Sequence, residues 1–354
     1  MGFLSDAELA GLTIVRMNFQ VVGEGAFNPR PAMAHVEQAD FFLGRVRDID
    51  ISAAFSFEPT SETKEIIRAV AAGEQRFATG AVALARDFDR AHVEQSKAGA
   101  FFVFELSAND PAAKLYALLK YDYSEVLTLR QSNAKGQLRK IVQAFVKDKR
   151  ALQKSALIRV VGGKVESEIS ATDRGARSPN ITDFFTRFLK VQRERDDVEL
   201  NKAASDALLE IASTVPVEHW PNGRAAALST MRESLRASRE ISDDVVINAV
   251  WIAAGRPNDE ELSEALRKRA IAALKKKKIS GLRFQTNSTV FKVASKRKIR
   301  TVENVRIEFP DSLSGVVVDT EHEEDGSAVI TIRTKQIASD EVVTETIGNV
   351  RQLT

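Results

Sequence analysis

The side chains best placed to do chemistry are the lysines and arginines between residues 267 and 300. This span contains thirteen Lys or Arg and no Asp or Glu. Of the 51 basic residues in the chain, 38 therefore lie elsewhere, together with all 49 acidic ones. One basic block in an otherwise acidic chain indicates a localised anionic partner.

Two patches of this block are candidates for contacts with phosphate. The first is "LKKKKISGLRF" (residues 274–284), the second is "SKRKIR" (residues 295–300), and polar residues that can donate to phosphate oxygens lie between them. Lysine outnumbers arginine in the block, which favours point-charge contacts to the backbone over reading of bases. We predict that double-stranded DNA binds, with little sequence preference, at Lys275, Lys276, Lys277, Lys278, Arg283, Lys292, Lys296, Arg297, Lys298 and Arg300.

The four consecutive lysines also allow a structural interpretation. Lysines are common at the C-terminal end of a helix, where the helix dipole stabilises them. Successive helical residues rotate by about 100°, so four in a row surround the helix axis and cannot lie flat on a core. We therefore expect this turn either to project into solvent or to unwind.

No motif in the sequence predicts catalysis or a resident metal ion. There is no H-E-x-x-H zinc motif, no G-x-x-x-x-G-K-[ST] phosphate loop and no G-x-S-x-G nucleophile elbow. The absence of cysteine excludes disulfides and thiol nucleophiles. "VVGGKVESE" is typical of a turn between strands, and "EHEED" of a solvated hairpin tip. We predict no catalytic residue, no metal and no cofactor; the histidines lie in unrelated contexts at His35, His92, His219 and His322.

The sequence predicts a cytoplasmic protein without membrane insertion. Its longest apolar runs, such as "AFFVFEL", are far shorter than the roughly 20 residues that cross a bilayer. The N-terminal residues lack the basic and apolar regions of a secretory signal.

The length of 354 residues and the order of the patterns predict two domains and an α+β fold. We expect an α+β domain at residues 1–200, with an antiparallel sheet and helices, and a helical domain at 201–354 that ends in a small β unit. Strands are expected at 12–22 and, as a meander, in "GAFFVFEL", "KLYALLKYDY" and "EVLTLR". Helices are expected in "SETKEIIRAVAAG" and from Glu74 to about Gln95.

The clearest helical pattern is "SPNITDFFTRFLKVQRERDD". Its apolar residues recur with the spacing of one helix face, and Asn180 is the expected N-cap. We expect this face, which comprises Ile181, Phe184, Phe185, Phe188 and Leu189, to pack in the core.

The second half of the chain is predicted to contain several helices and then strands. Ser242 and Asn258 are the expected N-caps of two of these helices, and the second helix ends in the lysines. "VRIEF" alternates like a strand, and Asp325-Gly326 is a typical hairpin turn between two more strands.

The chain resembles the bacterial nucleoid-associated proteins of the YejK (NdpA) type over nearly its full length. The resemblance rests on "GAFFVFEL" with "KLYALLKYDYSEVLTL", on "DFFTRFLK", and on "VRIEFPDSLSG" with "AVITIRT". It implies a DNA-binding protein of the nucleoid without catalytic residues. The lysine run matches no motif of that family.

These observations favour a non-enzymatic DNA-binding protein that forms a homodimer or meets a protein partner through its N-terminal half. Two other functions stay open from the sequence. One is a component of antiphage defence, either a DNA sensor or a metal-dependent nuclease. The other is an adaptor whose basic block meets an acidic protein surface or an anionic lipid.

Overall fold

The computed structural model describes residues 2–33, 35–36, 38–91, 97–110, 112–122, 124–130, 137–144, 151–291, 296–310, 317–323 and 326–337. The chain divides by its contacts into two compact units, Met1–Lys292 and Val293–Thr354. The division at residue 200 expected from the sequence remains a prediction.

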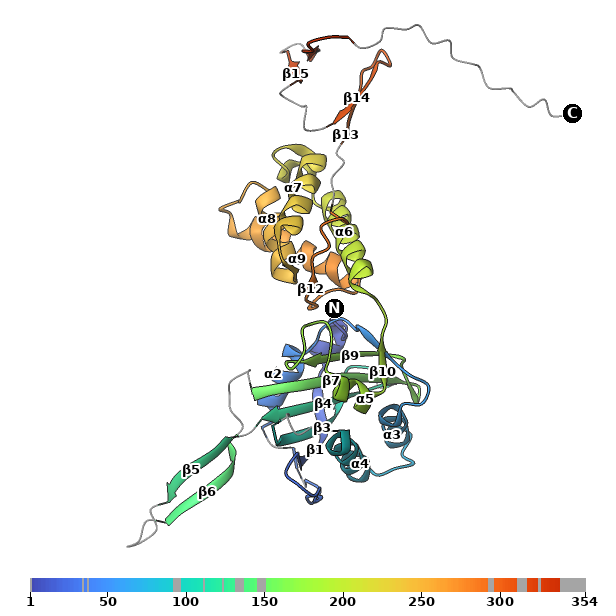
Figure 1. Cartoon of the computed structure of the whole chain (residues 1–354), viewed down its shortest axis with the longest axis vertical. Helices are drawn as coiled ribbons and strands as arrows, with labels where there is room; N and C mark the ends of the chain where they lie inside the picture. The colour runs from blue at the N-terminus through green and yellow to red at the C-terminus, as the bar shows by residue number, and fades with distance from the viewer. Residues whose placement is uncertain are drawn as a thin grey trace, which may run out of the picture. The chain divides into compact units, whose positions relative to one another are not determined.

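An antiparallel sheet organises the first part of the larger unit (Figure 1). Its strand order is β1-β3-β4-β7-β9-β2-β10, and β8 pairs with β7. Nearly every residue of β3 and β4 is buried, because helices cover both faces of these central strands. The strands are β1 (Thr13–Val22), β2 (Phe55–Phe57), β3 (Gly99–Ser107), β4 (Ala113–Asp122), β7 (Leu152–Val161), β8 (Lys164–Val165), β9 (Glu168–Asp173) and β10 (Val191–Arg193).

Two hydrophobic clusters lie on opposite faces of this sheet because side chains alternate along a strand. Phe102 and Phe104 of β3 belong to one cluster, to which α2 (Ala39–Asp48) contributes residues and against which α1 (Asp6–Ala10) packs. Phe101 and Val103 belong to the other, with α3 (Glu62–Ala71), α4 (Phe77–Ala91) and α5 (Asp183–Leu189).

The phenylalanine-rich segment forms α5 and packs in the core, as predicted. Phe188 meets Phe88 of α4 and Phe101 of β3, with ring centroids 5.1 and 5.8 Å apart. The predicted N-cap was wrong: the helix begins at Asp183 after Thr182, so Asn180 lies outside it. The apolar spacing extends back to Ile181, which is buried although it precedes the helix.

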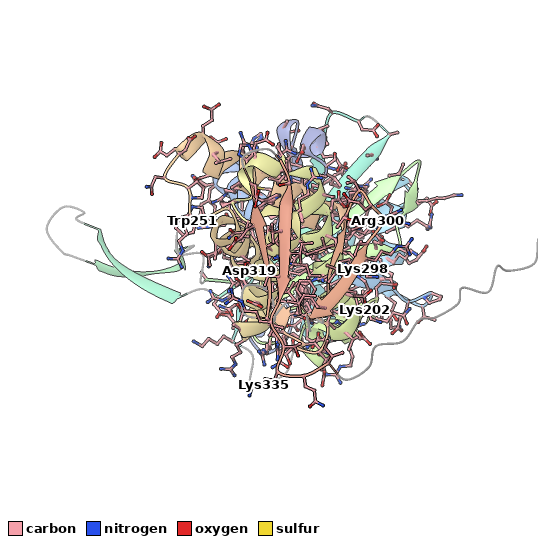
Figure 2. All side chains as sticks on the ribbon, turned by 90° about the horizontal axis from the view of Figure 1, so that it is seen from above. Lys202, Trp251, Lys298, Arg300, Asp319 and Lys335 are labelled. Atoms are coloured by element: carbon pink, nitrogen blue, oxygen red, sulfur yellow. The ribbon has the colours of Figure 1, made fainter. Side chains whose placement is uncertain are left out.

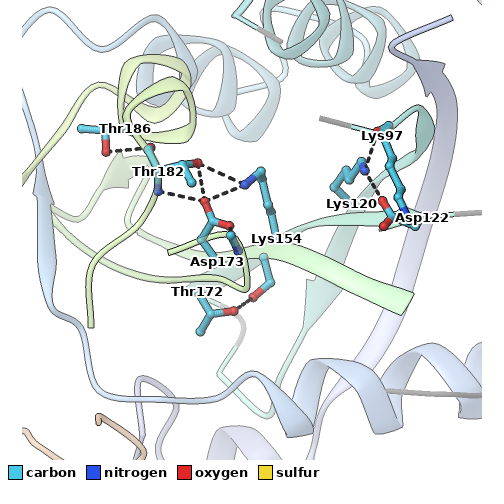
Figure 3. Close-up of polar contacts among 10 residues, drawn as sticks. Lys97, Lys120, Asp122, Lys154, Thr172, Asp173, Thr182 and Thr186 are labelled. Carbon is cyan, nitrogen blue, oxygen red and sulfur yellow. Dashed lines mark hydrogen bonds and ion pairs between the residues drawn. The ribbon is translucent and has the colours of Figure 1, made fainter. Parts of the chain in front are cut away.

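A buried ion pair fixes the start of α5 to the sheet (Figure 3). The Lys154 ammonium on β7 lies 2.6 Å from the Asp173 carboxylate at the end of β9, and their side chains are 5% and 0% exposed. Asp173 also accepts hydrogen bonds from the amides of Gly175, at 2.8 Å, and Thr182, at 2.9 Å, and from the Thr182 hydroxyl. The carboxylate therefore sets the path of the loop that enters α5.

The other end of α5 is held by α3. The Ser61 hydroxyl donates to the Leu189 carbonyl at 2.6 Å, and the Thr63 hydroxyl donates to the Phe188 carbonyl at 2.8 Å. Ser61 also caps α3, where its hydroxyl accepts from the Lys64 amide. Both ends of the short helix thus have buried polar partners.

The rest of the larger unit is helical: α6 (Asp197–Thr214), α7 (Gly223–Ala237), α8 (Asp243–Ala253) and α9 (Glu260–Lys276). Between them β11 (Glu240–Ile241) pairs with β12 (Phe284–Gln285). Ser242 caps α8, as predicted. The cap of α9 is Asp259, whose carboxylate accepts from two amides of the first turn, and not the predicted Asn258.

Three further hairpins complete the described structure. β5 (Ser124–Arg130) pairs with β6 (Gln137–Ala144) and not with the sheet, so the predicted meander is wrong at its third strand. In the smaller unit β13 (Lys296–Arg300) pairs with β14 (Arg306–Pro310), and β15 (Val318–His322) with β16 (Ala328–Ile332). The last pair confirms the predicted hairpin; Asp325 of its turn lies outside the described residues. The predicted α+β class is confirmed.

Removal of the Asp173 carboxylate should destabilise the protein strongly. Asp173→Ala leaves the Lys154 ammonium buried without its counter-charge, which typically costs about 3–5 kcal/mol. We expect a marked fall in the urea midpoint of unfolding. Glu74→Gln, at an exposed ion pair with Arg68, is the matched control and should leave the midpoint unchanged.

The pH dependence of stability gives an independent readout of the same group. Burial raises the pKa of Asp173, but hydrogen bonds from Lys154 and Thr182 outweigh burial and hold the pKa below its ordinary value of 3.8. A depressed folded-state pKa adds stability above pH 3.8, which is lost as the pH falls through the folded-state pKa. Asp173→Asn should flatten this acid limb, and an unchanged limb would contradict the assignment.

Candidate nucleic-acid interface

The predicted DNA-binding residues fall on two separate structural elements. We call residues 275–278 the lysine run; it ends α9 in the larger unit. We call strands β13 and β14 the basic hairpin; it lies in the smaller unit. The block that is continuous in sequence is therefore divided between the two units.

The lysine run unwinds, which is one of the two conformations expected from the sequence. The helix ends at Lys276, Lys277 is its C-cap, and Lys278 takes a left-handed conformation with φ 53°. Leu274 and Ile279 on either side are buried, so the run is anchored at both ends. Gly281 has φ 76°, and a Cβ there would lie 2.7 Å from the Ile51 side chain, which excludes other residues.

Each lysine of the run meets a carboxylate of its own unit. Lys275 pairs with Asp6 of α1 at 3.0 Å, and Lys278 with Glu168 of β9 at 2.6 Å. Glu210 of α6 lies 2.8 Å from the Lys276 ammonium and 3.7 Å from that of Lys277. The run thus links α9 to three other elements, and part of its charge is compensated.

The backbone of the run is also bound. The Arg195 guanidinium, which precedes α6, donates to the carbonyls of Lys277, at 3.1 Å, and Lys278. Backbone carbonyls at the C-terminal end of a helix have no hydrogen-bond donors within the helix, and Arg195 supplies donors here. Burial lowers the pKa of Arg195. Arg195 is therefore a further cation at this helix end, next to the four lysines.

Two predicted residues lie between the run and the hairpin. Arg283 is exposed, next to β12. Burial raises the pKa of Asp243. Hydrogen bonds from Gly281 and Ser280 and the positive charge of Arg283 oppose this rise but do not cancel it. Lys292 lies outside the described residues.

The basic hairpin carries the exposed cations of the second patch. Its two strands contain five Lys or Arg and one acid, Glu308. Figure 2 labels Lys298 and Arg300 on β13. Lys298 pairs with Glu308 at 3.2 Å, and its side chain is 74% exposed. Arg297 is exposed as well, whereas the side chain of Lys296 lies outside the described part.

The register of the hairpin places two arginines opposite each other. Arg300 on β13 faces Arg306 on β14, and both are exposed. Residues directly opposite in an antiparallel pair share a face, and like charges there are destabilising. The Arg300 guanidinium donates to Asn304 at 2.9 Å. An anion between the two guanidinium groups would relieve their repulsion, and each can bind phosphate with two N–H groups.

Some features of this surface were not predicted. Arg306 was not among the predicted contacts, although "VRIEF" placed it on the polar face of a strand. The carboxylates that meet the lysine run lie far away in sequence: Glu210 is 66 residues from Lys276, and Asp6 is 269 residues from Lys275. No local pattern signals such distant pairs.

Metal-ligand clusters and membrane-spanning helices are both absent from the described residues. They contain no group of three or more His, Asp or Glu side chains arranged to hold a metal ion. Among the helices of the described ranges, none is long and apolar enough to cross a membrane.

Comparison with known proteins identifies one family. The family model described as nucleoid-associated protein YejK matches residues 38–338, which include α2 to β16 and both cationic patches. No curated protein sequence matches the chain at a significant level.

Individual lysines of the two patches should differ in their reactivity toward an amine-acylating reagent, because their side chains differ in exposure. The side chains of Lys298 and Lys276 are 74% and 68% exposed, whereas those of Lys275 and Lys277 are 28% and 31% exposed. With limiting reagent, peptide mapping by mass spectrometry should find Lys298 and Lys276 modified before Lys275 and Lys277. Denaturation should remove the difference; equal rates in the folded chain would contradict the difference in exposure.

Proposed function

Because the chain belongs to the family of the nucleoid-associated protein YejK, we propose that it binds double-stranded DNA through phosphate contacts, largely without sequence preference. The family match is the observation that carries this proposal, since it supports a nucleoid-associated, DNA-binding role for most of the chain. We propose further that the protein is bacterial and non-enzymatic, and that it is located with the nucleoid in the cytoplasm.

The basic hairpin is the proposed principal contact. Its five cations face one acid, and Lys298, Arg300 and Arg306 are exposed. A two-stranded ribbon fits the width of the major groove of B-DNA, and phosphates along its edges can accept from lysine and arginine. Phosphate oxygens near Arg300 and Arg306 would offset the repulsion between the two guanidinium groups.

The lysine run, together with Arg283, is a secondary contact in this proposal. Its lysines already meet Asp6, Glu168 and Glu210, so DNA phosphates compete with carboxylates for them. Exposed ion pairs contribute only about 0–1 kcal/mol, so a polyanion can displace them. The homodimer and the protein partner expected from the sequence remain predictions.

DNA binding should weaken steeply with salt and depend on the hairpin. If about six cations engage phosphates, the log-log slope of affinity against salt is about −5. The triple variant Lys298→Glu, Arg300→Glu, Arg306→Glu should lose at least tenfold in affinity for duplex and reduce the slope by about three. Gel shifts with duplex and single strand over a salt series measure both quantities.

The matched control reverses three exposed cations on α6 and α7. Lys202→Glu, Arg224→Glu and Arg236→Glu change the net charge by the same amount without touching either cationic patch. We expect this variant to stay within about threefold of the wild type, because both cationic patches keep all their lysines and arginines. Equal losses of DNA affinity in the two variants would show that binding depends on the total charge of the protein and not on the hairpin in particular. Nicking of plasmid with magnesium or manganese would favour a nuclease instead.

Removal of the carboxylate shared by two lysines should strengthen DNA binding. Glu210→Gln frees Lys276 and Lys277 from their ion pairs, and we expect affinity for duplex to rise about two- to fivefold, since such pairs are worth up to about 1 kcal/mol. Glu233→Gln on α7, an exposed glutamate outside the lysine run, controls for the change in net charge. Identical affinities of the two variants would remove the lysine run from the interface.

A further inference from the structure

A cavity of about 850 Å³ lies at one end of the sheet in the larger unit. It is lined by residues of β4 and β7, by the loop that follows β9, and by α5. None of its lining residues belongs to the lysine run or to the basic hairpin. Its volume is within the range of sites for small ligands.

Two buried lysines line this cavity from neighbouring strands. Lys120 of β4 and Lys154 of β7 are direct register partners, and they are 2% and 5% exposed. Lysines are almost never fully buried unless they are paired. Two ammonium groups on facing positions repel each other, so the site needs negative charge to be stable.

The protein supplies part of that charge (Figure 3). The Lys120 ammonium pairs with Asp122 and donates to the Lys97 carbonyl at 2.8 Å. The Lys154 ammonium pairs with Asp173 and donates to the Thr182 hydroxyl at 3.1 Å. An ammonium has three N–H donors, and these contacts account for two oxygen atoms at each lysine.

The rim makes the cavity more positive. Lys97 and Arg187 also line it, and Arg187 is exposed at the edge of α5. Together with the two buried lysines they give four cations against three carboxylates, which are Asp122, Asp173 and Asp183. The ring of Phe184, 4.3 Å from the Lys154 ammonium, adds an apolar wall beside these charges.

We propose that this cavity binds a phosphate monoester group. A dianion fits a site with two buried ammonium groups and an arginine at its entrance, because lysine acts as a point charge toward phosphate and arginine adds a bidentate contact. Burial lowers the pKa of both lysines, and a bound dianion would oppose that shift. The group could belong to a free small ester or to the 5′ end of a nucleic acid strand.

Calorimetric titration of the full chain with inorganic phosphate, adenosine monophosphate and adenosine tests this site. We expect both phosphate compounds to bind and adenosine to fail. Arg187→Gln should weaken the binding of adenosine monophosphate at least tenfold, and so should Lys120→Met, which keeps an unbranched side chain at the position. Arg236→Gln on α7, an exposed arginine outside the cavity, should bind like the wild type.

The outcomes separate this site from the hairpin. No binding of either phosphate compound at millimolar concentration, or equal weakening by Arg187→Gln and Arg236→Gln, would overturn the proposal. Because Arg187→Gln alters an exposed side chain, it keeps the test valid if Lys120→Met does not fold. The hairpin triple variant should bind adenosine monophosphate normally, and Arg187→Gln should bind duplex with 5′-hydroxyl ends normally.

A pair of single-stranded oligonucleotides identifies the source of the phosphate. Tighter binding of the 5′-phosphorylated strand than of its 5′-hydroxyl twin, abolished by Arg187→Gln, assigns the cavity to nucleic acid ends. Equal binding of the two strands, with adenosine monophosphate still bound, assigns it to a free phosphate ester. Both results support the cavity as a phosphate site.

Discussion

The buried ion pair between Lys154 and Asp173 is the interaction on which the larger unit depends. It joins β7 to β9 within the sheet, and the same carboxylate holds Thr182 at the entry of α5. The phenylalanines of that helix pack against α4 and β3. Its C-terminal carbonyls accept hydrogen bonds from hydroxyl groups at the start of α3. A seven-residue helix is too short to be stable alone, so its position has to come from these contacts. One satisfied carboxylate therefore links the sheet to the packing of three helices.

The same physical rule separates the two cationic patches. At the lysine run, carboxylates from three distant elements lie within 4 Å of the ammonium groups, and the charges contribute to cohesion within the unit. The strands of the basic hairpin carry five cations and one carboxylate, and two of the arginines face each other. Compensated charges stabilise the fold modestly, whereas uncompensated ones gain most from an external polyanion. This contrast is the reason we propose the hairpin as the principal contact for phosphate, even though the lysine run is the more conspicuous sequence.

The sequence predicted those features that local patterns determine. The alternation and apolar runs of β1, β3 and β4, the phenylalanine face of α5 and the cap Ser242 are all visible in short local patterns of the sequence. Errors arose where a local choice was ambiguous by one or two residues, as with Asn258 against Asp259. They also arose where pairing is non-local: β5 has strand character but pairs with β6, and β4 pairs with β7 across that hairpin. Strand propensity does not specify a partner.

The same limit applies to the candidate sites. A run of four lysines is visible in the sequence, but its effective charge depends on Asp6, Glu168 and Glu210, which only the fold brings near it. Conversely, Lys120 and Lys154 stand in segments that read as ordinary strands, and nothing local marks them as buried. Their register across β4 and β7 places the two buried lysines on directly opposite positions of neighbouring strands. Charge in this protein therefore has to be assessed by what surrounds each group, since the net value of +2 for the whole chain reflects none of these local imbalances.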